Sequence, residues 1–174
     1  LRPVMIHAQL VRKDQLRQMA ALGMFASFFV AHTYYWGDVH LRNFGRKRAE
    51  KISPVRTAIR EEVPYTFHQD TPVLPPDMLD TVWCAVNRIT REGKQLGVEE
   101  RISPYEALQA VTINAAAQYF EEDEKGSIRP GKRADLVILE RSPLSCPPEE
   151  IRNIQVLRTI KDGKTLYERE GKTG

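Results

Sequence analysis

Short apolar runs alternate with segments of helical periodicity in the first two thirds of the chain. Residues 4–6 form an apolar run that ends at His7, and the segment 14–22 carries apolar residues at helical spacing. Residues 24–31 form a second run, apolar except for Ser27, that ends at His32, as is typical of a strand buried on both faces. The pattern therefore predicts a strand, a helix and a second strand.

The next segments continue this alternation with weaker signals. We expect a polar, aromatic loop at 34–37 and a very short strand at 51–53. A helix is predicted at 54–61, because proline is favoured in the first turn of a helix. The run at 65–68 is interpreted as a further strand, which Asp70 closes.

Two later helices have clear capping signals. Asp77 is expected to cap a helix whose apolar positions extend to Ile89. Ser103 and Glu106 form a capping box, and Pro104 occupies the first helical position, so a helix is predicted at 104–110.

Turn signals replace helical periodicity beyond residue 120. Three short strands are expected, at 127–128, 135–139 and 156–160. The pair Asp162-Gly163 predicts a hairpin into a last strand at 164–168. We therefore divide the chain into β/α repeats at 1–120 and a small all-β portion at 121–174.

Composition and charge exclude several classes of protein. With 41% hydrophobic and 28% charged residues, the chain has the composition of a folded globular protein. The net charge of +3 is too small to indicate a nucleic-acid partner. The longest apolar stretch, 22–31, is about half of a bilayer span, so no membrane segment is expected. Cys84 and Cys146 form no Cys-x-x-Cys pair, which argues against a cysteine zinc site and suggests reduced thiols in the cytoplasm.

Three polar side chains follow predicted strands. His7, His32 and Asp70 each stand at the carboxyl end of a strand, where parallel β/α barrels assemble their sites. Imidazole and carboxylate groups bind divalent zinc well, so these residues are candidate metal ligands. The alternatives are a hydrogen-bonded core histidine for His7 and a turn or helix cap for Asp70.

Four further residues are candidates for supporting roles. If the strand at 65–68 continues, His68 shares a face with Asp70, where it either packs structurally or orients the carboxylate. His40 is either a surface residue or a substrate contact. Tyr34 and Trp36 either line a substrate pocket or pack against a neighbouring segment.

Several motifs in order carry a resemblance to a known family. They are Ile-His-Ala-Gln at 6–9, Ala-His-Thr at 31–33, Asp-Thr-Pro-Val at 70–73, and the segments 112–116 and 125–137. Together they resemble the amidohydrolase superfamily, specifically its N-substituted formamide deformylase-like branch.

The resemblance implies a (β/α)₈ barrel with one or two divalent metal ions, with zinc the expected metal. Family ligands are a His-x-His pair on the first strand, a carboxylate or carboxylated lysine on the fourth, histidines on the fifth and sixth, and an aspartate on the eighth. By this resemblance His7 belongs to the fifth strand, His32 to the sixth and Asp70 to the eighth. Asp70 would also accept a proton from the attacking water and pass it to the leaving nitrogen of a small amide-type substrate.

The chain departs from the family in containing no His-x-His sequence. We therefore expect the C-terminal half of a TIM-type barrel, strands five to eight, followed by a few strands of a β-sandwich. Such a portion is expected to be inactive alone. Its exposed sheet edges favour association with a second copy or with the missing N-terminal half. The alternative is a non-catalytic metal-binding or interaction module built on the same scaffold.

Overall fold

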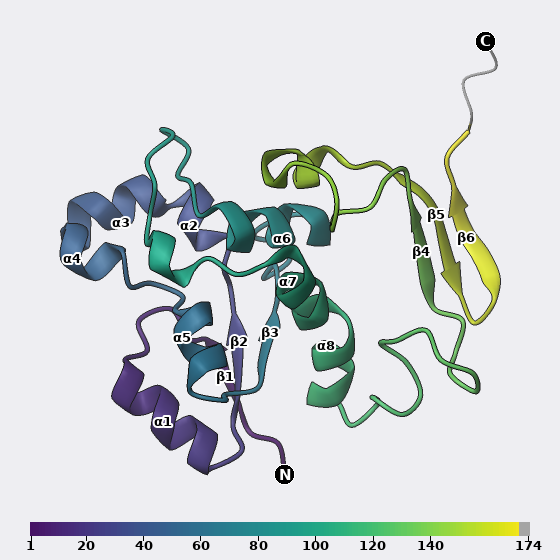
Figure 1. The fold of residues 1–174 in the computed structure, drawn as a ribbon, viewed down its shortest axis with the longest axis horizontal. Helices are drawn as coiled ribbons and strands as arrows, with labels where there is room; N and C mark the ends of the chain where they lie inside the picture. The colour runs from purple at the N-terminus through teal and green to yellow at the C-terminus, as the bar shows by residue number, and fades with distance from the viewer. Residues whose placement is uncertain (171–174) are drawn as a thin grey trace.

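The first sheet of the computed structural model, which describes residues 1–170, is parallel (Figure 1). It contains β1 (Val4–His7), β2 (Phe25–Phe28) and β3 (Tyr65–Phe67) in that order. Each strand pairs directly with the next, so that Met5 lies opposite Ala26 and Ala26 opposite Tyr65. The three strands predicted to end near His7, His32 and Asp70 are therefore neighbours.

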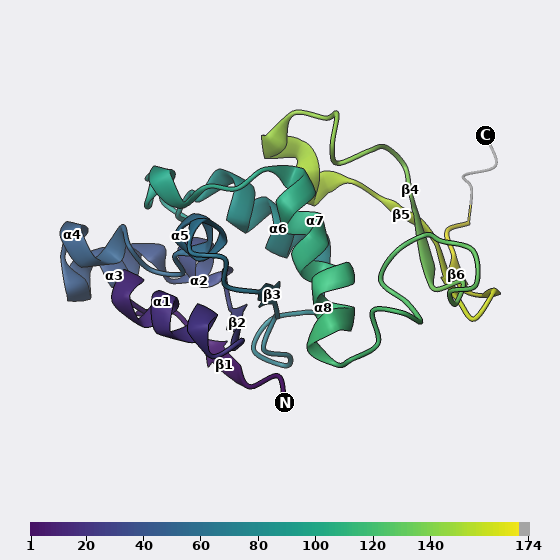
Figure 2. The ribbon, with the colours of Figure 1, turned by 60° about the horizontal axis from the view of Figure 1, so that its bottom comes forward.

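Helices connect and cover these strands, as expected of β/α repeats. The main ones are α1 (Lys13–Ala21), α5 (Val55–Arg60), α6 (Met78–Asn87), α7 (Pro104–Val111) and α8 (Ile113–Gln118). Their apolar faces bury Leu16, Phe28 and Val82 completely. Figures 1 and 2 both place α8 beside β3, and α1 on the far side of the sheet from α7.

The segment after β2 is helical, so the loop expected at 34–37 is wrong. It contains α2 (His32–Tyr35), α3 (Gly37–Phe44) and α4 (Arg46–Ala49). The ring of Tyr34 packs against Trp83 of α6, with 5.2 Å between ring centroids. Burial of such rings stabilises a helical turn whose local signals are those of a loop.

The strand expected at 51–53 is also wrong, because β2 pairs directly with β3. The carbonyl oxygens of Ile52 and Ser53 accept hydrogen bonds from the fully buried guanidinium of Arg88, at 2.8 and 3.0 Å. These groups are thus satisfied without a neighbouring strand. The sheet has three strands where four were expected.

Both capping predictions are confirmed. The Asp77 side chain accepts a hydrogen bond from the backbone N–H of Asp80 at 3.0 Å and starts α6. Ser103 and Glu106 form the reciprocal capping box of α7. A short 3-10 helix, η1 (Val98–Glu100), precedes α7.

The second sheet is antiparallel and lies on the α7 and α8 side of the first (Figure 2). Its strands are β4 (Leu136–Leu139), β5 (Val156–Lys161) and β6 (Lys164–Glu168). Asp162 and Gly163 have φ values of 48° and 75°, so the predicted hairpin is confirmed. The strand expected at 127–128 is wrong, since Ile128 is 89% exposed and has no strand partner within residues 1–170.

A second 3-10 helix, η2 (Pro148–Asn153), lies between β4 and β5 and packs against the core around the first sheet. Trp83 donates its indole N–H to the carbonyl oxygen of Glu149 at 2.9 Å, and Ile151 is fully buried. The division of the chain at residue 120 stays a prediction. Trp83 and Glu149 lie on opposite sides of that boundary in the sequence and are in contact.

The longest helix between residues 1 and 170, α6, has 10 residues. In this part of the chain no helix is long and apolar enough to cross a bilayer.

Candidate metal centre

His7, His68 and Asp70 come together at the carboxyl ends of β1 and β3. Each offers one ligand atom, and the three atoms lie within 4.8 Å of one another. Nδ1 of His7 is 3.3 Å from Nε2 of His68. Both histidines are partly buried and Asp70 is exposed, so the cluster opens to solvent on its carboxylate side.

Backbone geometry, rather than strand alternation, places two of these side chains. His7 and Asp70 have φ values of 64° and 54°, in the left-handed region that non-glycine residues seldom adopt. β3 ends at Phe67, so Asp70 stands in the turn after the strand. Unusual backbone conformations of this kind cluster at functional sites, where the surrounding structure stabilises them.

The donor set fits a divalent metal. Two histidine nitrogens that share one tetrahedral zinc, each about 2.0 Å from it, stand about 3.3 Å apart. Nδ1 of His68 lies 2.8 Å from Oγ of Ser27, so a proton on Nδ1 leaves Nε2 free as a ligand. Ser27 was not among the expected site residues, although it is the one hydroxyl side chain in the apolar run 24–31.

His32 lies next to this cluster but outside it. It begins α2, four residues after the end of β2, and its ring centroid is 6.3 Å from that of His7. Burial, then the nearby imidazoles of His40 and His7, lowers the pKa of His32 to about 4. Geometry thus groups His7 and Asp70 with His68, and not with His32.

The other expected site residues separate into two locations. The Trp36 ring lies 4.9 Å from that of His32, and Nε2 of His40 lies 3.2 Å from Nδ1 of His32. Tyr34 instead lies beneath the guanidinium of Arg152, 4.4 Å from it, where η2 joins the core. Trp36 and His40 therefore contact His32, whereas Tyr34 contacts the returning segment.

Two residues that the sequence analysis missed anchor α3, which carries His40. Asp38 accepts hydrogen bonds from the Thr90 hydroxyl at 2.9 Å and from the Glu92 backbone N–H at 3.1 Å. A Cβ on Gly37 would lie 2.6 Å from Cγ2 of Thr90, so only glycine permits this approach. The sequence signal for these two residues was the Gly-Asp pair that follows Trp36, but Gly37 was assigned to the loop expected at 34–37.

Parallel strands joined by helices, with candidate metal ligands at their carboxyl ends, define an α/β protein whose candidate site lies where β/α barrels assemble theirs. The amidohydrolase family model matches residues 1–167, and the chain belongs to that family. The expected resemblance is therefore confirmed.

Relatives support this assignment. The chain is 36% identical over 166 residues to the N-substituted formamide deformylase of Arthrobacter pascens, covering 95% of this chain and 31% of that protein. It is 31% identical over 163 residues to the protein LONG AFTER FAR-RED 3 of Arabidopsis thaliana, covering 92% and 28%. An uncharacterized metal-dependent hydrolase of Pyrococcus horikoshii superposes with a TM-score of 0.70 at 27% identity, covering 82% and 29%.

The chain thus spans about a third of the length of the curated relatives it matches.

Proposed function

We propose that this chain forms part of a metal-dependent hydrolase of non-peptide carbon–nitrogen bonds, with small amide-type substrates. The observation that carries the proposal is the approach of His7, His68 and Asp70 to within 4.8 Å at the ends of parallel strands. Similarity to the formamide deformylase favours amides among the substrates of the family.

Each residue of the centre has a distinct role in this proposal. His7, His68 and Asp70 would hold the ion, for which zinc is the expected metal, and Ser27 orients His68. A divalent ion bound there would supply Lewis-acid chemistry for hydrolysis of an amide by water. Asp70 is exposed beside them, where it accepts a proton from the attacking water and returns it to the leaving nitrogen.

Direct pairing of the three strands changes their expected numbering. If β3 is the eighth barrel strand, β2 is the seventh and β1 the sixth. His7 is then the sixth-strand ligand, and His32 follows a strand that supplies no ligand in the family pattern described above. The first-strand His-x-His pair is absent from this sequence, so we propose that the chain is inactive by itself.

Metal analysis distinguishes the two possible ligand sets. We expect about one zinc ion per chain after dialysis, by elemental analysis, because three protein ligands suffice for an open zinc site. His7→Ala, His68→Ala and Asp70→Asn should lose the ion, while the neighbouring His32→Ala should keep it. Loss in His32→Ala with retention in His68→Ala would contradict the ligand set, and no metal above background would contradict binding by this chain alone.

An activity assay separates the enzyme from the non-catalytic module. We expect no hydrolysis of N-substituted formamides by the chain alone, and turnover when a family polypeptide carrying the first five barrel strands is added. Asp70→Asn should abolish that turnover while circular dichroism shows a retained fold. Binding of the added polypeptide without turnover would instead favour an interaction module.

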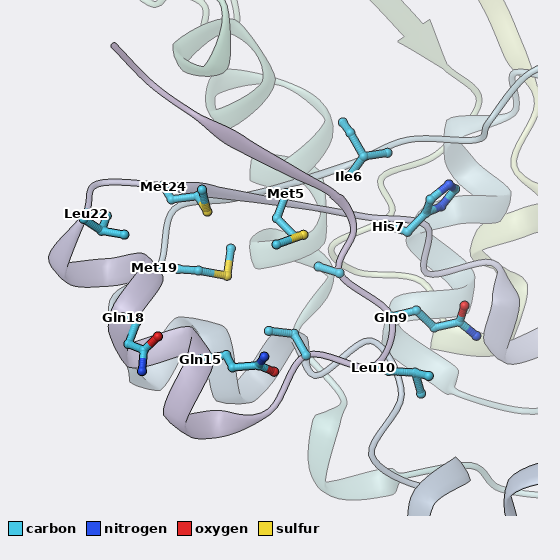
Figure 3. Close-up of a pocket in the computed structure, with 12 residues that line it drawn as sticks. Met5, Ile6, His7, Gln9, Leu10, Gln15, Gln18, Met19, Leu22 and Met24 are labelled. Atoms are coloured by element: carbon cyan, nitrogen blue, oxygen red, sulfur yellow. The ribbon is translucent and has the colours of Figure 1, made fainter.

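The open edge of β1 is the proposed contact for association. Met5 and Ile6 on this strand are 43% and 56% exposed. In Figure 3, Met5, Met19 and Met24 gather between β1 and α1, and Ile6 points to the opposite side. Met5, Ile6, Met19 and Met24 are among the residues that line a cavity of about 460 Å³. An unpaired strand beside apolar side chains is a template for another strand, either from a second copy or from the remainder of the barrel.

Solution mass tests this contact. The chain alone should self-associate, and Met5→Lys should shift the distribution toward monomer, because a charge on an edge strand opposes pairing. Val73→Lys is the matched control, since Val73 is 52% exposed and lies outside β1. A monomeric wild-type chain, or equal effects of the two variants in sedimentation experiments, would contradict the proposal.

A further inference from the structure

A single residue separates two of the proposed metal ligands. Gln69 stands between His68 and Asp70 in the sequence, and it is 3% exposed. The ring of His68 lies beside His7, whereas the side chain of Gln69 contacts α6. Successive side chains of an extended segment point to opposite faces, which accounts for this difference. Gln69 therefore supports the centre from behind and is not one of its ligands.

The amide group of Gln69 is bound to the start of α6. Its Nε2 donates to the backbone carbonyl oxygen of Asp77 at 2.5 Å and also contacts Oγ1 of Thr81. A carbonyl oxygen can only accept a hydrogen bond, so the amide group has one orientation, with Nε2 toward α6. Asp77 caps this helix, and Thr81 is fully buried in it. Gln69 thus ties the segment between two proposed ligands to the N-terminal end of α6.

Other hydrogen bonds do little to hold the turn that carries Asp70. His68 donates the last backbone hydrogen bond from this segment to β2, at 3.2 Å. The hydrogen bonds of residues 70–76 stay within the turn or reach Asp77, as does the 2.8 Å bond from the Val73 N–H to the Asp70 carbonyl oxygen. Among residues 1–170, the Gln69 side chain therefore supplies the hydrogen bonds that join this turn to the middle of the protein.

We propose that Gln69 is a positioning residue of the metal centre: it ties the turn to α6 and thereby holds the Asp70 carboxylate within ligand distance of the two histidines. The left-handed backbone of Asp70, with φ of 54°, needs such support from the surrounding structure. Only the effect on the metal rests on the proposed function, because the tether to α6 exists without an ion.

Loss of this tether should leave the fold intact. The Asp77 carbonyl oxygen also accepts hydrogen bonds from the backbone N–H and the hydroxyl group of Thr81, both at 3.2 Å, so it keeps its donors without Gln69. Oε1 of Gln69 is buried and has no donor within residues 1–170, so its removal relieves an unsatisfied acceptor. The consequences of a substitution should therefore be confined to the turn.

Zinc affinity and stability together separate positioning from a purely structural role. Gln69→Met removes the donor from a side chain of similar length. In competition with a chromophoric chelator, zinc affinity should fall by about 10-fold, the lower end of the effect of losing an outer partner of a metal site. The urea unfolding midpoint of the metal-free chain should stay at the wild-type value.

Gln118→Met is the matched control, because Gln118 of α8 accepts a hydrogen bond from the Thr66 hydroxyl of β3 at 2.6 Å and does not contact the turn. It should leave zinc affinity unchanged. Wild-type affinity in Gln69→Met, or an equal loss of affinity in both variants, would overturn the proposal.

Hydrogen exchange of the metal-free chain tests the tether directly. The Val73 N–H reports on the turn, and the Arg88 N–H, which donates to the Cys84 carbonyl oxygen at 3.0 Å, reports on the far end of α6. Gln69→Met should speed exchange at Val73 by about 2- to 12-fold, the effect of one hydrogen bond, and leave exchange at Arg88 unchanged.

Unchanged exchange at Val73, or the same increase at both amides, would overturn the inference. Because this measurement needs no metal, a wild-type chain that binds no zinc would contradict the proposed function, while exchange at Val73 still decides whether Gln69 holds the turn.

Discussion

The hydroxyl group of Ser27 provides a sharp test of the metal centre, because it touches a proposed ligand without being one. Ser27 is 4% exposed, and its Oγ lies 2.8 Å from Nδ1 of His68. Ser27→Ala removes the partner that holds the imidazole with Nε2 available. Loss of such an orienting partner typically weakens metal affinity by about 10- to 100-fold, or about 1.4–2.7 kcal/mol.

A second buried serine supplies the control. Ser53 is fully buried, and its hydroxyl has no hydrogen-bond partner within residues 1–170. Ser53→Ala removes an unsatisfied polar group, so the free energy of unfolding should rise by about 1 kcal/mol. Ser27→Ala should instead lower the free energy of unfolding of the metal-free chain by about 0.5–1.5 kcal/mol, the net contribution of one hydrogen bond.

Competition with a chromophoric zinc chelator measures affinity, and urea unfolding measures stability. We expect weaker zinc binding in Ser27→Ala and unchanged binding in Ser53→Ala. Unchanged affinity in Ser27→Ala, or the same loss in both variants, would refute a role for the hydroxyl in orienting His68.

Three further substitutions test the framework that holds the centre. Arg88→Met leaves three backbone carbonyls without their donor, so urea unfolding should show a loss of about 3–5 kcal/mol. Gly37→Ala places a Cβ 2.6 Å from Cγ2 of Thr90. We expect α3 to be displaced and the free energy of unfolding, measured by thermal unfolding, to fall by about 1–3 kcal/mol. Wild-type stability would show that this close approach is not constrained. Arg152→Met breaks the ion pair with Asp80 and should release η2, seen as faster cleavage of the 141–147 segment in limited proteolysis; wild-type cleavage would contradict this.

Helix caps and the hairpin turn were predictable because their chemistry is local. The Asp77 cap, the Ser103–Glu106 box and the Asp162-Gly163 turn each involve residues at most three positions apart. Neighbouring residues are always close in space, so the sequence pattern alone identifies these features.

The misassigned segments have partners that are distant in the sequence. A short strand was expected at 51–53, but the carbonyls of Ser53 and Ile52 are satisfied by Arg88, which lies 35 and 36 positions away. The helix at Tyr34 depends on burial against Trp83. No local pattern indicates where a distant guanidinium or ring will pack.

The sequence by itself determined the family, the alternation of strands and helices, and His7 and Asp70 as candidate ligands at strand ends. Only the tertiary structure decided which histidine accompanies them. His32 and His68 both follow apolar runs, yet His68 meets His7 across 61 positions, and Ser27 directs its ring from the strand between them. Metal ligation depends on distances and directions between atoms of different strands, and pairing of those strands, rather than the order of residues along one of them, sets these distances.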